Sequence, residues 1–332
     1  MKTLKKFKLI GLSLLMSLLL PSYGFSQENK TPSLTKTFVM DQPGTLNASS
    51  SGGGVVVESH NQKNVVVQAY VRKNGRILSP SDPSLKEVLE DFEVAIEKSG
   101  SVVTANVKRK GNFNLWNNVG ISLTILVPRE MSCNVSSSGG GVRISGVSGT
   151  HSFSSSGGGV HLENVSGITK AKSSGGSVKA VNQNGDVQLS SSGGGVSVEG
   201  AHGNVVAHSS GGGVHLTDIQ GDVDAGSSGG GVSVSGESAS VKATSSGGSV
   251  KVNIGKLSRE LYLQSSGGGI EAVIQNGDKL GLDLDLRADR VNIDLHDFSG
   301  TSEKNRVNGT MNGGGIRVYM HASGGNVNLH WE

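Results

Sequence analysis

Cysteine and aromatic residues are scarce in this sequence. Only one cysteine, Cys133, is present among 332 residues, so no disulfide can form within the chain even in an oxidising compartment. Aromatic residues make up 4% of the chain, which leaves few rings that could stack on a sugar. After the N-terminal segment, no apolar run is long enough to cross a bilayer as a helix. A disulfide scaffold and a helical membrane protein are therefore not expected.

The N-terminus has the features of a secretory signal peptide. Residues 1–26 combine four lysines with the apolar run 9–20 and small residues near Ser26, where we expect cleavage. The chain is then exported, to the periplasm, the outer surface or the medium. Removing the four lysines leaves 26 basic against 27 acidic residues, so the formal charge changes from +3 to about −1. A near-neutral chain lacks the positive charge expected of a nucleic-acid-binding protein.

Glycine, in contrast, is abundant and regularly placed. The motif Ser-Ser-Gly-Gly-(Gly/Ser)-Val recurs at one constant interval, which is the signature of a repeat architecture. The first glycines of the successive motifs are Gly139, Gly157, Gly175, Gly193, Gly211, Gly229 and Gly247.

Each 18-residue copy is predicted to contain two short strands, because strand side chains alternate between two faces. Apolar residues stand three and five positions after the first glycine, as at Val196 and Val198. The strand before the glycine has small inward residues, including an unbroken serine column from Ser137 to Ser245. The motif glycines mark one corner of the copy, and a second glycine column, 149 to 221, marks the other.

A copy of this kind cannot bury its own apolar face, so neighbouring copies must stack and share one core. The copy is also too short for a propeller blade, which needs roughly 40 residues. The sequence therefore predicts an all-β fold, a β-solenoid of 18-residue coils spaced by about 4.8 Å. A stack of antiparallel hairpins is the main alternative, because turn pairs such as Asn184-Gly185 also favour tight hairpins.

The period divides the remaining chain into three parts. Residues 27–131 are predicted to form an irregular β-rich N-terminal cap that contains one short helix, beginning near Asp82 and Pro83. Residues 132–275 form the regular solenoid, and residues 276–332 form irregular C-terminal coils and a cap. Such atypical end units hide the open edges of a solenoid. Within the regular part, Cys133 occupies an inward position and is expected to be a buried structural thiol rather than a reactive or intermolecular one.

The run 121–142, ISLTILVPREMSCNVSSSGGGV, places an alternating strand, a Val-Pro-Arg break and the first glycine motif in succession. Together with the repeated SSGGGV and the closing Asn312-Gly-Gly-Gly, it resembles the bacterial putative-adhesin family of glycine-rich β-repeat domains, a family of unknown function. The resemblance covers nearly all of the mature chain. It implies a secreted or envelope-associated β-solenoid, and it supplies no catalytic residues.

One outward column carries basic side chains and is the best candidate for a binding surface. It could bind an anionic glycan or a membrane surface, or it could simply keep the sheet soluble, since Glu163 and Glu199 partly neutralise it. The basic members of this column are Arg143, His161, Lys179, His215 and Lys251. Trp116, in the segment 112–118, is either an exposed binding tip or a hairpin anchor.

Enzymatic and metal sites are weakly supported. Glu163 and Glu199 share a column two coils apart, with roughly 9.6 Å expected between their backbones. This spacing is within reach of the carboxylate separation that an inverting glycosidase uses. His161 and His215 lie three coils apart, too far for shared zinc coordination. Aspartate and asparagine in the column Asp186, Asn204 and Asp222 suggest either calcium binding or ordinary turn chemistry, and the turn is favoured.

We therefore expect a non-enzymatic, exported β-solenoid that acts as an adhesion, interaction or scaffolding module of the cell envelope. It needs no cofactor, and its partner is an envelope or extracellular protein or glycan that the sequence does not identify. A polysaccharide-active enzyme on a β-helical scaffold is the competing interpretation.

Overall fold

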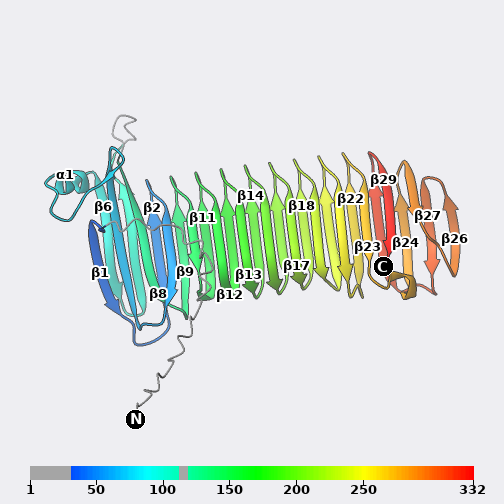
Figure 1. Cartoon of the computed structure of the whole chain (residues 1–332), viewed down its shortest axis with the longest axis horizontal. Coiled ribbons are helices and arrows are strands. Elements are labelled where there is room, and N and C mark those ends of the chain that lie inside the picture. Colours follow the sequence, from blue (N-terminus) through cyan, green and yellow to red (C-terminus); the bar gives the residue numbers. More distant parts are fainter. Residues whose placement is uncertain (1–30, 112–118) are drawn as a thin grey trace, which may run out of the picture. The chain divides into compact units, whose positions relative to one another are not determined.

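The computed structural model describes residues 31–111 and 119–332. The predicted signal peptide and Trp116 therefore lie outside the described residues. Residues 32–332 form one compact unit. Within it, each strand of a regular coil pairs in parallel with the strand at the same position of the next coil, as when Val187 faces Val205 and Val196 faces Val214 (Figure 1). The predicted β-solenoid is confirmed, and the antiparallel hairpin alternative is wrong.

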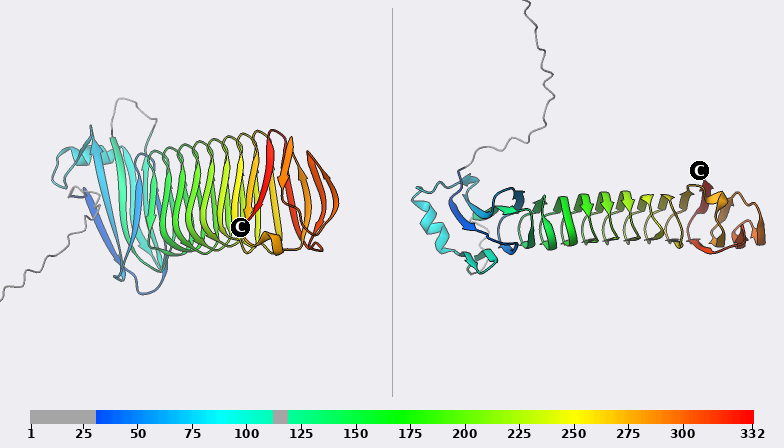
Figure 2. Two further views of the ribbon diagram at one scale, coloured as in Figure 1. Left: turned by 45° about the vertical axis from the view of Figure 1, so that its right-hand side comes forward. Right: turned by 90° about the horizontal axis from the view of Figure 1, so that it is seen from below.

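Every regular coil contributes one strand to each of two rows, and Figure 2 shows these rows from two directions. The first row, called face one, contains β9 (Met131–Ser137), β11 (Ser148–Ser155), the second half of β12 (Val160–Ser173), β14 (Val187–Ser191), β16 (Val205–Ser209), β18 (Val223–Ser227), β20 (Ser240–Ser245) and β22 (Glu260–Ser265). The second row, called face two, contains β10 (Val142–Ser145), the first half of β12, β13 (Val178–Asn184), β15 (Val196–His202), β17 (Val214–Gln220), β19 (Val232–Glu237), β21 (Val250–Gly255) and β23 (Ile270–Ile274).

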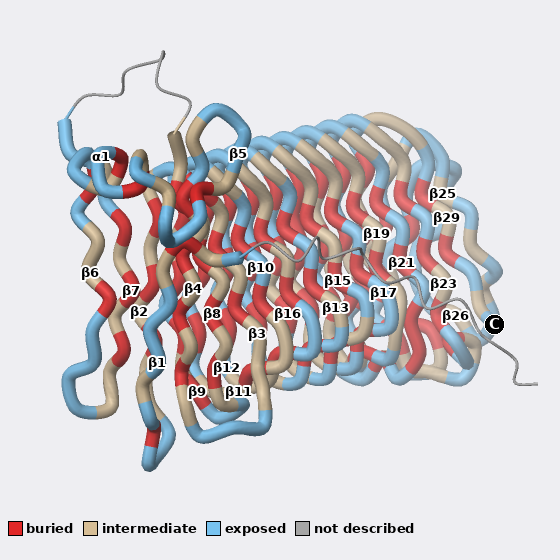
Figure 3. The backbone as a smooth tube through the Cα atoms, turned by 60° about the vertical axis from the view of Figure 1, so that its left-hand side comes forward, coloured by how far each residue is buried: buried red, intermediate tan, exposed pale blue. Residues whose placement is uncertain are grey.

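A thin core runs between the two faces. Inward columns such as Val196, Val198 and Ala201 are buried in coil after coil, and buried positions alternate with open ones along each strand (Figure 3). The small inward residues of face one, such as Ala207, allow the two faces to approach closely. Each coil therefore buries little apolar area on its own, and the shared stack supplies the hydrophobic stabilisation.

The glycine motif closes the first corner through a serine bracket, which we define as one inward serine hydroxyl holding two backbone groups. Ser191 Oγ accepts the Gly194 N–H at 3.0 Å and donates to the Gly176 carbonyl of the preceding coil at 2.8 Å. The bracket recurs in the motif serines from Ser137 to Ser265. Gly194 is required by close approach, since a Cβ there would lie 2.6 Å from the Ser177 nitrogen.

The second corner depends on backbone conformation instead. Gly185 and Gly203 have φ values of 120° and 141°, which side-chain-bearing residues rarely adopt. A further left-handed column, not anticipated from the sequence, interrupts face two at Asn164, Asn182 and Asp218, with φ of 53°, 52° and 54°. Asparagine and aspartate tolerate this conformation better than other side chains do. The kink turns a third residue inward, such as Ala201 or Ile219.

At the N-terminal end, the coil of β2 (Gly44–Ser50) and β3 (Val55–His60) lies between two others. On one side it pairs with β9 and β10, and on the other with β7 (Val102–Arg109) and β8 (Val119–Pro128). Antiparallel strands cover the outermost coil: β1 (Leu34–Val39), β4 (Asn64–Lys73), β5 (Arg76–Ile77) and β6 (Phe92–Ser99).

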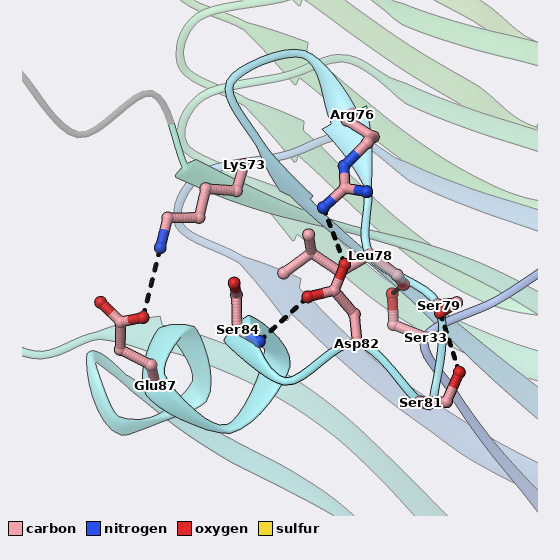
Figure 4. A network of polar contacts seen from close by, with 9 residues as sticks. All are labelled: Ser33, Lys73, Arg76, Leu78, Ser79, Ser81, Asp82, Ser84 and Glu87. Atoms are coloured by element: carbon pink, nitrogen blue, oxygen red, sulfur yellow. Dashed lines mark hydrogen bonds and ion pairs between the residues drawn. The ribbon is translucent and has the colours of Figure 1, made fainter.

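The predicted helix is α1 (Ser84–Glu90), which buries Leu85 and Val88. Asp82 precedes it and accepts the Ser84 N–H at 2.9 Å. Figure 4 shows how Arg76, 2.8 Å from Asp82, ties this turn to the β4–β5 hairpin.

At the C-terminal end, as at the N-terminal end, one coil lies between two others and its strands come from a distant part of the chain. The last two strands, β28 (Ile316–Ala322) and β29 (Asn326–Trp331), pair with β22 and β23, as when Ile270 faces Val327. Their other neighbours are β24 (Leu282–Arg287) and β25 (Arg290–Ile293), so the terminal coil lies inside the stack (Figure 1). The short 3₁₀ helix η1 (Gly277–Lys279) and the antiparallel strands β26 (Phe298–Glu303) and β27 (Arg306–Met311) complete this end.

Candidate anion-binding surface

Three basic residues of the predicted column occupy successive coils of face two. Arg143 in β10 is the register partner of His161 in β12, and His161 is the register partner of Lys179 in β13. Because adjacent strands of a sheet lie about 4.8 Å apart, the three side chains leave the sheet side by side. We call these three residues the basic ladder.

The basic ladder lines a surface hollow of about 430 Å³ next to the first corner. Its floor includes Gly141 and Gly159, which have no side chains to fill the space, and Val56 closes the N-terminal side. The hollow thus combines cationic side chains with bare backbone at one corner of three neighbouring coils. An anionic group entering it would meet charge and would displace no bulky side chain.

The charges of Arg143 and Lys179 affect the pKa of His161, the central residue of the ladder. Partial burial lowers the pKa of His161, and the positive charge of Arg143 lowers it further, as does Lys179. Glu163, on the same strand, acts in the opposite direction. Among the described residues, neither Arg143 nor Lys179 forms a close ion pair, so their charges are not neutralised by a neighbouring carboxylate. The ladder therefore has a positive potential that a bound anion would relieve.

The other two basic residues of the predicted column, His215 and Lys251, lie apart from the basic ladder. Ser197 separates Lys179 from His215, so this histidine lies two coils beyond the ladder. Lys251 forms an ion pair with Glu271, with 3.0 Å between Nζ and Oε2, and lines a separate hollow of about 250 Å³. The structure therefore brings three of the predicted basic residues together and leaves two apart.

The two candidate catalytic carboxylates stand on an open sheet. Glu163 and Glu199 are exposed, and Val181 lies between them in the register. An inverting glycosidase needs a shaped site between its two carboxyl groups, with one group kept protonated by its surroundings. Neither glutamate lines any of the hollows described in this section.

Cys133 is buried, and burial raises the pKa of its thiol to about 12. Its thiolate fraction at neutral pH is consequently very small, which agrees with a structural rather than a reactive role. The next inward residue of this column is His151, which is buried and lies in register with Cys133. Burial lowers the pKa of His151, and its ring stacks on Phe153 with 5.6 Å between centroids.

The predicted turn column of Asp186, Asn204 and Asp222 is linked by hydrogen bonds within the protein. Asp186 accepts the Asn204 backbone N–H at 2.9 Å, and Asn204 accepts the Asp222 N–H at 3.3 Å. Asp222 is also paired with Arg259. These oxygens link one coil to the next, which explains the column without a bound ion.

Two features of the ends were missed in the sequence. A pocket of about 390 Å³ lies between three loops of the N-terminal part, and its lining includes His60, Lys63 and Arg129. On face one, Tyr262 of β22 is the register partner of Tyr319 of β28. The signal for this pair is the likeness of LYLQSSGGGI (261–270) to VYMHASGGNV (318–327), which aligns the two tyrosines.

Two negative findings apply to the described part of the chain. In residues 31–111 and 119–332, no group of three or more His, Cys, Asp and Glu side chains could hold a metal ion. Across the same ranges, no helix has both the length and the apolar character needed to cross a membrane.

The fold and this surface define a two-faced parallel β-solenoid with a basic ladder. No protein-family model and no curated protein matches the chain. Solved structures that are similar include a putative adhesin from Parabacteroides merdae, with 11% identity, a TM-score of 0.40, and 91% of this chain and 97% of that chain covered. A putative adhesin from Bacteroides fragilis has 13% identity and a TM-score of 0.33, covering 90% and 96%. A putative lipid binding protein from Parabacteroides distasonis has 13% identity and a TM-score of 0.33, covering 90% and 97%. Values this low do not transfer a function to this chain.

Proposed function

We propose that the chain is an exported, non-enzymatic module that binds an anionic polymer of the cell envelope or its surroundings through the basic ladder. The observation that supports this best is the placement of Arg143, His161 and Lys179 on adjacent coils around one hollow. The predicted N-terminal signal peptide supports export. Adhesion or scaffolding would follow from holding such a polymer along the solenoid.

The ligand's chemistry follows from that of the ladder. Guanidinium and ammonium groups form charge-assisted hydrogen bonds with carboxylate, sulfate or phosphate oxygens, and Arg143 can bind two oxygens of one group. The hollow lies on the surface of the sheet, so a single small anion would be held weakly. A polymer that presents several anionic groups in a row gains from effective concentration once its first group is bound. An acidic polysaccharide is the source we favour.

Binding measurements with a double variant would test the proposal. We expect Arg143→Gln combined with Lys179→Gln to weaken binding of an acidic polysaccharide such as polygalacturonate by at least tenfold, because each charged contact contributes roughly 1.5 kcal/mol or more. Lys251→Gln is the matched control, since it removes a lysine of the same column that is already paired with Glu271. Isothermal titration at low and high salt would give both affinities, and salt should weaken the wild-type interaction.

The pH dependence gives a second measurement on the same site. A bound anion favours the charged imidazole of His161, whose pKa is otherwise lowered by burial, Arg143 and Lys179 against the opposing charge of Glu163. Affinity should therefore increase as the pH falls below about 6.5, the ordinary pKa of histidine. His161→Gln should remove this increase while retaining binding at pH 8.

Three outcomes would contradict the proposal. Equal losses in the double variant and in Lys251→Gln would show that binding depends only on net charge. Binding to vesicles containing anionic lipid, with none to polygalacturonate, would identify a membrane surface as the source of the anionic groups. Turnover of a polysaccharide that disappears in Glu163→Gln would establish the enzymatic alternative instead.

A further inference from the structure

An aromatic cluster on face one combines side chains from two strands near the C-terminal end, β22 and β28. The rings of Tyr262 and Tyr319 are parallel, with 4.6 Å between centroids and 1° between planes. Since their strands are parallel and in register, both hydroxyls leave the sheet side by side. The Tyr319 hydroxyl lies 2.6 Å from Nδ1 of His321, two residues along the same strand. Two phenol oxygens and an imidazole nitrogen are therefore neighbours on an accessible surface.

The other side of the imidazole faces a carboxylate. His321 Nε2 lies 3.5 Å from Asp285 Oδ1 on β24, and Arg287 fixes this carboxylate with 3.1 Å between Nε and Oδ1. The arrangement fits the tautomer in which Nε2 carries the proton and Nδ1 presents its lone pair to Tyr319. In metal sites, a ligating histidine commonly donates its other N–H to a carboxylate, which sets the tautomer and the ring orientation.

Sugar stacking does not fit this geometry as well. A sugar needs an open ring face, whereas each tyrosine covers one face of the other, and the His321 ring lies against Tyr319 with 3.9 Å between centroids. A purely structural aromatic ladder would account for the ring stacking. It would not require an imidazole lone pair at the hydroxyl, nor a carboxylate fixed by arginine behind that imidazole.

We propose that Tyr262 Oη, Tyr319 Oη and His321 Nδ1 form a binding site for ferric iron, with Asp285 positioning the histidine. Each phenol loses its proton to solvent as its oxygen binds the ion, and the iron stays ferric throughout. Phenolate and imidazole are both established iron ligands in proteins. Two oxygens on one ion can be up to about 4 Å apart, twice a bond of about 2 Å. The ring centroids are 4.6 Å apart, so the two rings must tilt their hydroxyls toward each other to bind the ion. Water or a small anion fills the remaining positions.

The test uses the purified protein and ferric nitrilotriacetate, which keeps the ion soluble. Binding should produce a visible phenolate-to-iron charge-transfer band that saturates at one iron per chain. Tyr319→Phe and Tyr262→Phe should each abolish the saturable band while keeping the ring in the stack. Tyr70→Phe is the matched control, because the Tyr70 and Tyr262 hydroxyls both donate to a glutamine two residues away at 3.0 Å.

The role of Asp285 has its own test. Asp285→Asn should weaken iron binding by roughly 10- to 100-fold, as is usual for the loss of such a partner, and should leave the colour of the saturated complex unchanged. Circular dichroism before each titration would show that a variant is folded. No band with the wild-type protein, a band that survives Tyr319→Phe, or equal losses in Tyr70→Phe would overturn the proposal. None of these results depends on the basic ladder, which lies on the opposite face.

Discussion

In the central coils, every strand pairs with the strands one period before and one period after it in the sequence, whereas at both ends a coil is supplied from a distant part of the chain. The coil of β2 and β3 lies between strands that follow it by tens of residues, and the coil of β28 and β29 lies between β22–β23 and β24–β25. The C-terminal strands β28 and β29 are thus held by two neighbours each, whereas β1, the first strand at the N-terminal end, pairs with β4 alone. Fraying of the C-terminal coil would therefore require breaking two ladders at once.

The two regions also differ in what their surfaces carry. The central coils repeat one pattern of serine, glycine and valine, so their outward positions vary mainly in charge. The ends contain the pocket lined by His60 and Arg129 as well as the tyrosine pair of face one. Breaking the period frees side chains from the demands of the repeat, and chemically diverse clusters therefore occur where the period is broken.

The largest expected effect concerns the first corner of a central coil. We expect Gly194→Val to destabilise the protein by well over the roughly 1 kcal/mol typical of a point mutation, because its Cβ would meet backbone of the preceding coil at 2.6 Å. Ser197→Val, on the outward column of the following strand, should change stability by less than about 0.5 kcal/mol. Thermal melts of both variants would measure the difference. Similar shifts in the two would show that the corner tolerates side chains.

Much of the central region could be predicted, because a constant sequence period fixes register as well as strand positions. The columns of Val196, Val198 and Ser191 are inward as expected, and the parallel stacking follows from the need to share a core. The ends could not be predicted in the same way. The pairing of Ile270 with Val327 spans a long excursion of the chain through β24 to β27, which breaks the constant period. Only the likeness of residues 261–270 to residues 318–327 points to such a distant partner.

The candidate site was predictable in part for a related reason. Membership of one column placed Arg143, His161 and Lys179 together, because neighbouring coils repeat positions. The ion pair between Lys251 and Glu271, which neutralises the charge of Lys251, was not predicted from the sequence. Glu271 is the register partner of Lys251, and it belongs to the first coil in which the constant period is broken. The pairing of Tyr262 with Tyr319 was not predicted for the same reason as that of the terminal coil, because β24 to β27 separate their two strands in the sequence.

The second expected effect, of intermediate size, tests the serine bracket within a central coil. Ser191→Ala removes one hydroxyl that serves the Gly194 N–H and the Gly176 carbonyl. Leaving a buried polar group without a partner costs about 1–3 kcal/mol, so the variant should melt clearly below the wild type but above Gly194→Val. Ser190→Ala, one residue earlier and exposed, is the control and should melt like the wild type. A wild-type melt for Ser191→Ala would mean that the bracket contributes nothing.

The smallest effect is expected in the terminal coil, which lacks the bracket serine of the central coils. Ala322 stands in the terminal coil at the position of the bracket serine, in register with Ser265, and the adjoining Gly325 N–H donates instead to Asp289 Oδ2 at 3.2 Å. Asp289 thus supplies from β24–β25 the acceptor that a serine supplies in the central coils. Ala322→Ser should therefore gain at most the bond to the Gly268 carbonyl and raise stability by no more than about 0.5–1 kcal/mol. In an Asp289→Ala background, the same serine would supply the missing acceptor, so its stabilising effect should become larger. Thermal melts of the two single variants and the double variant give this coupling, and an Ala322→Ser effect that is equal in both backgrounds would show that Asp289 does not substitute for the bracket.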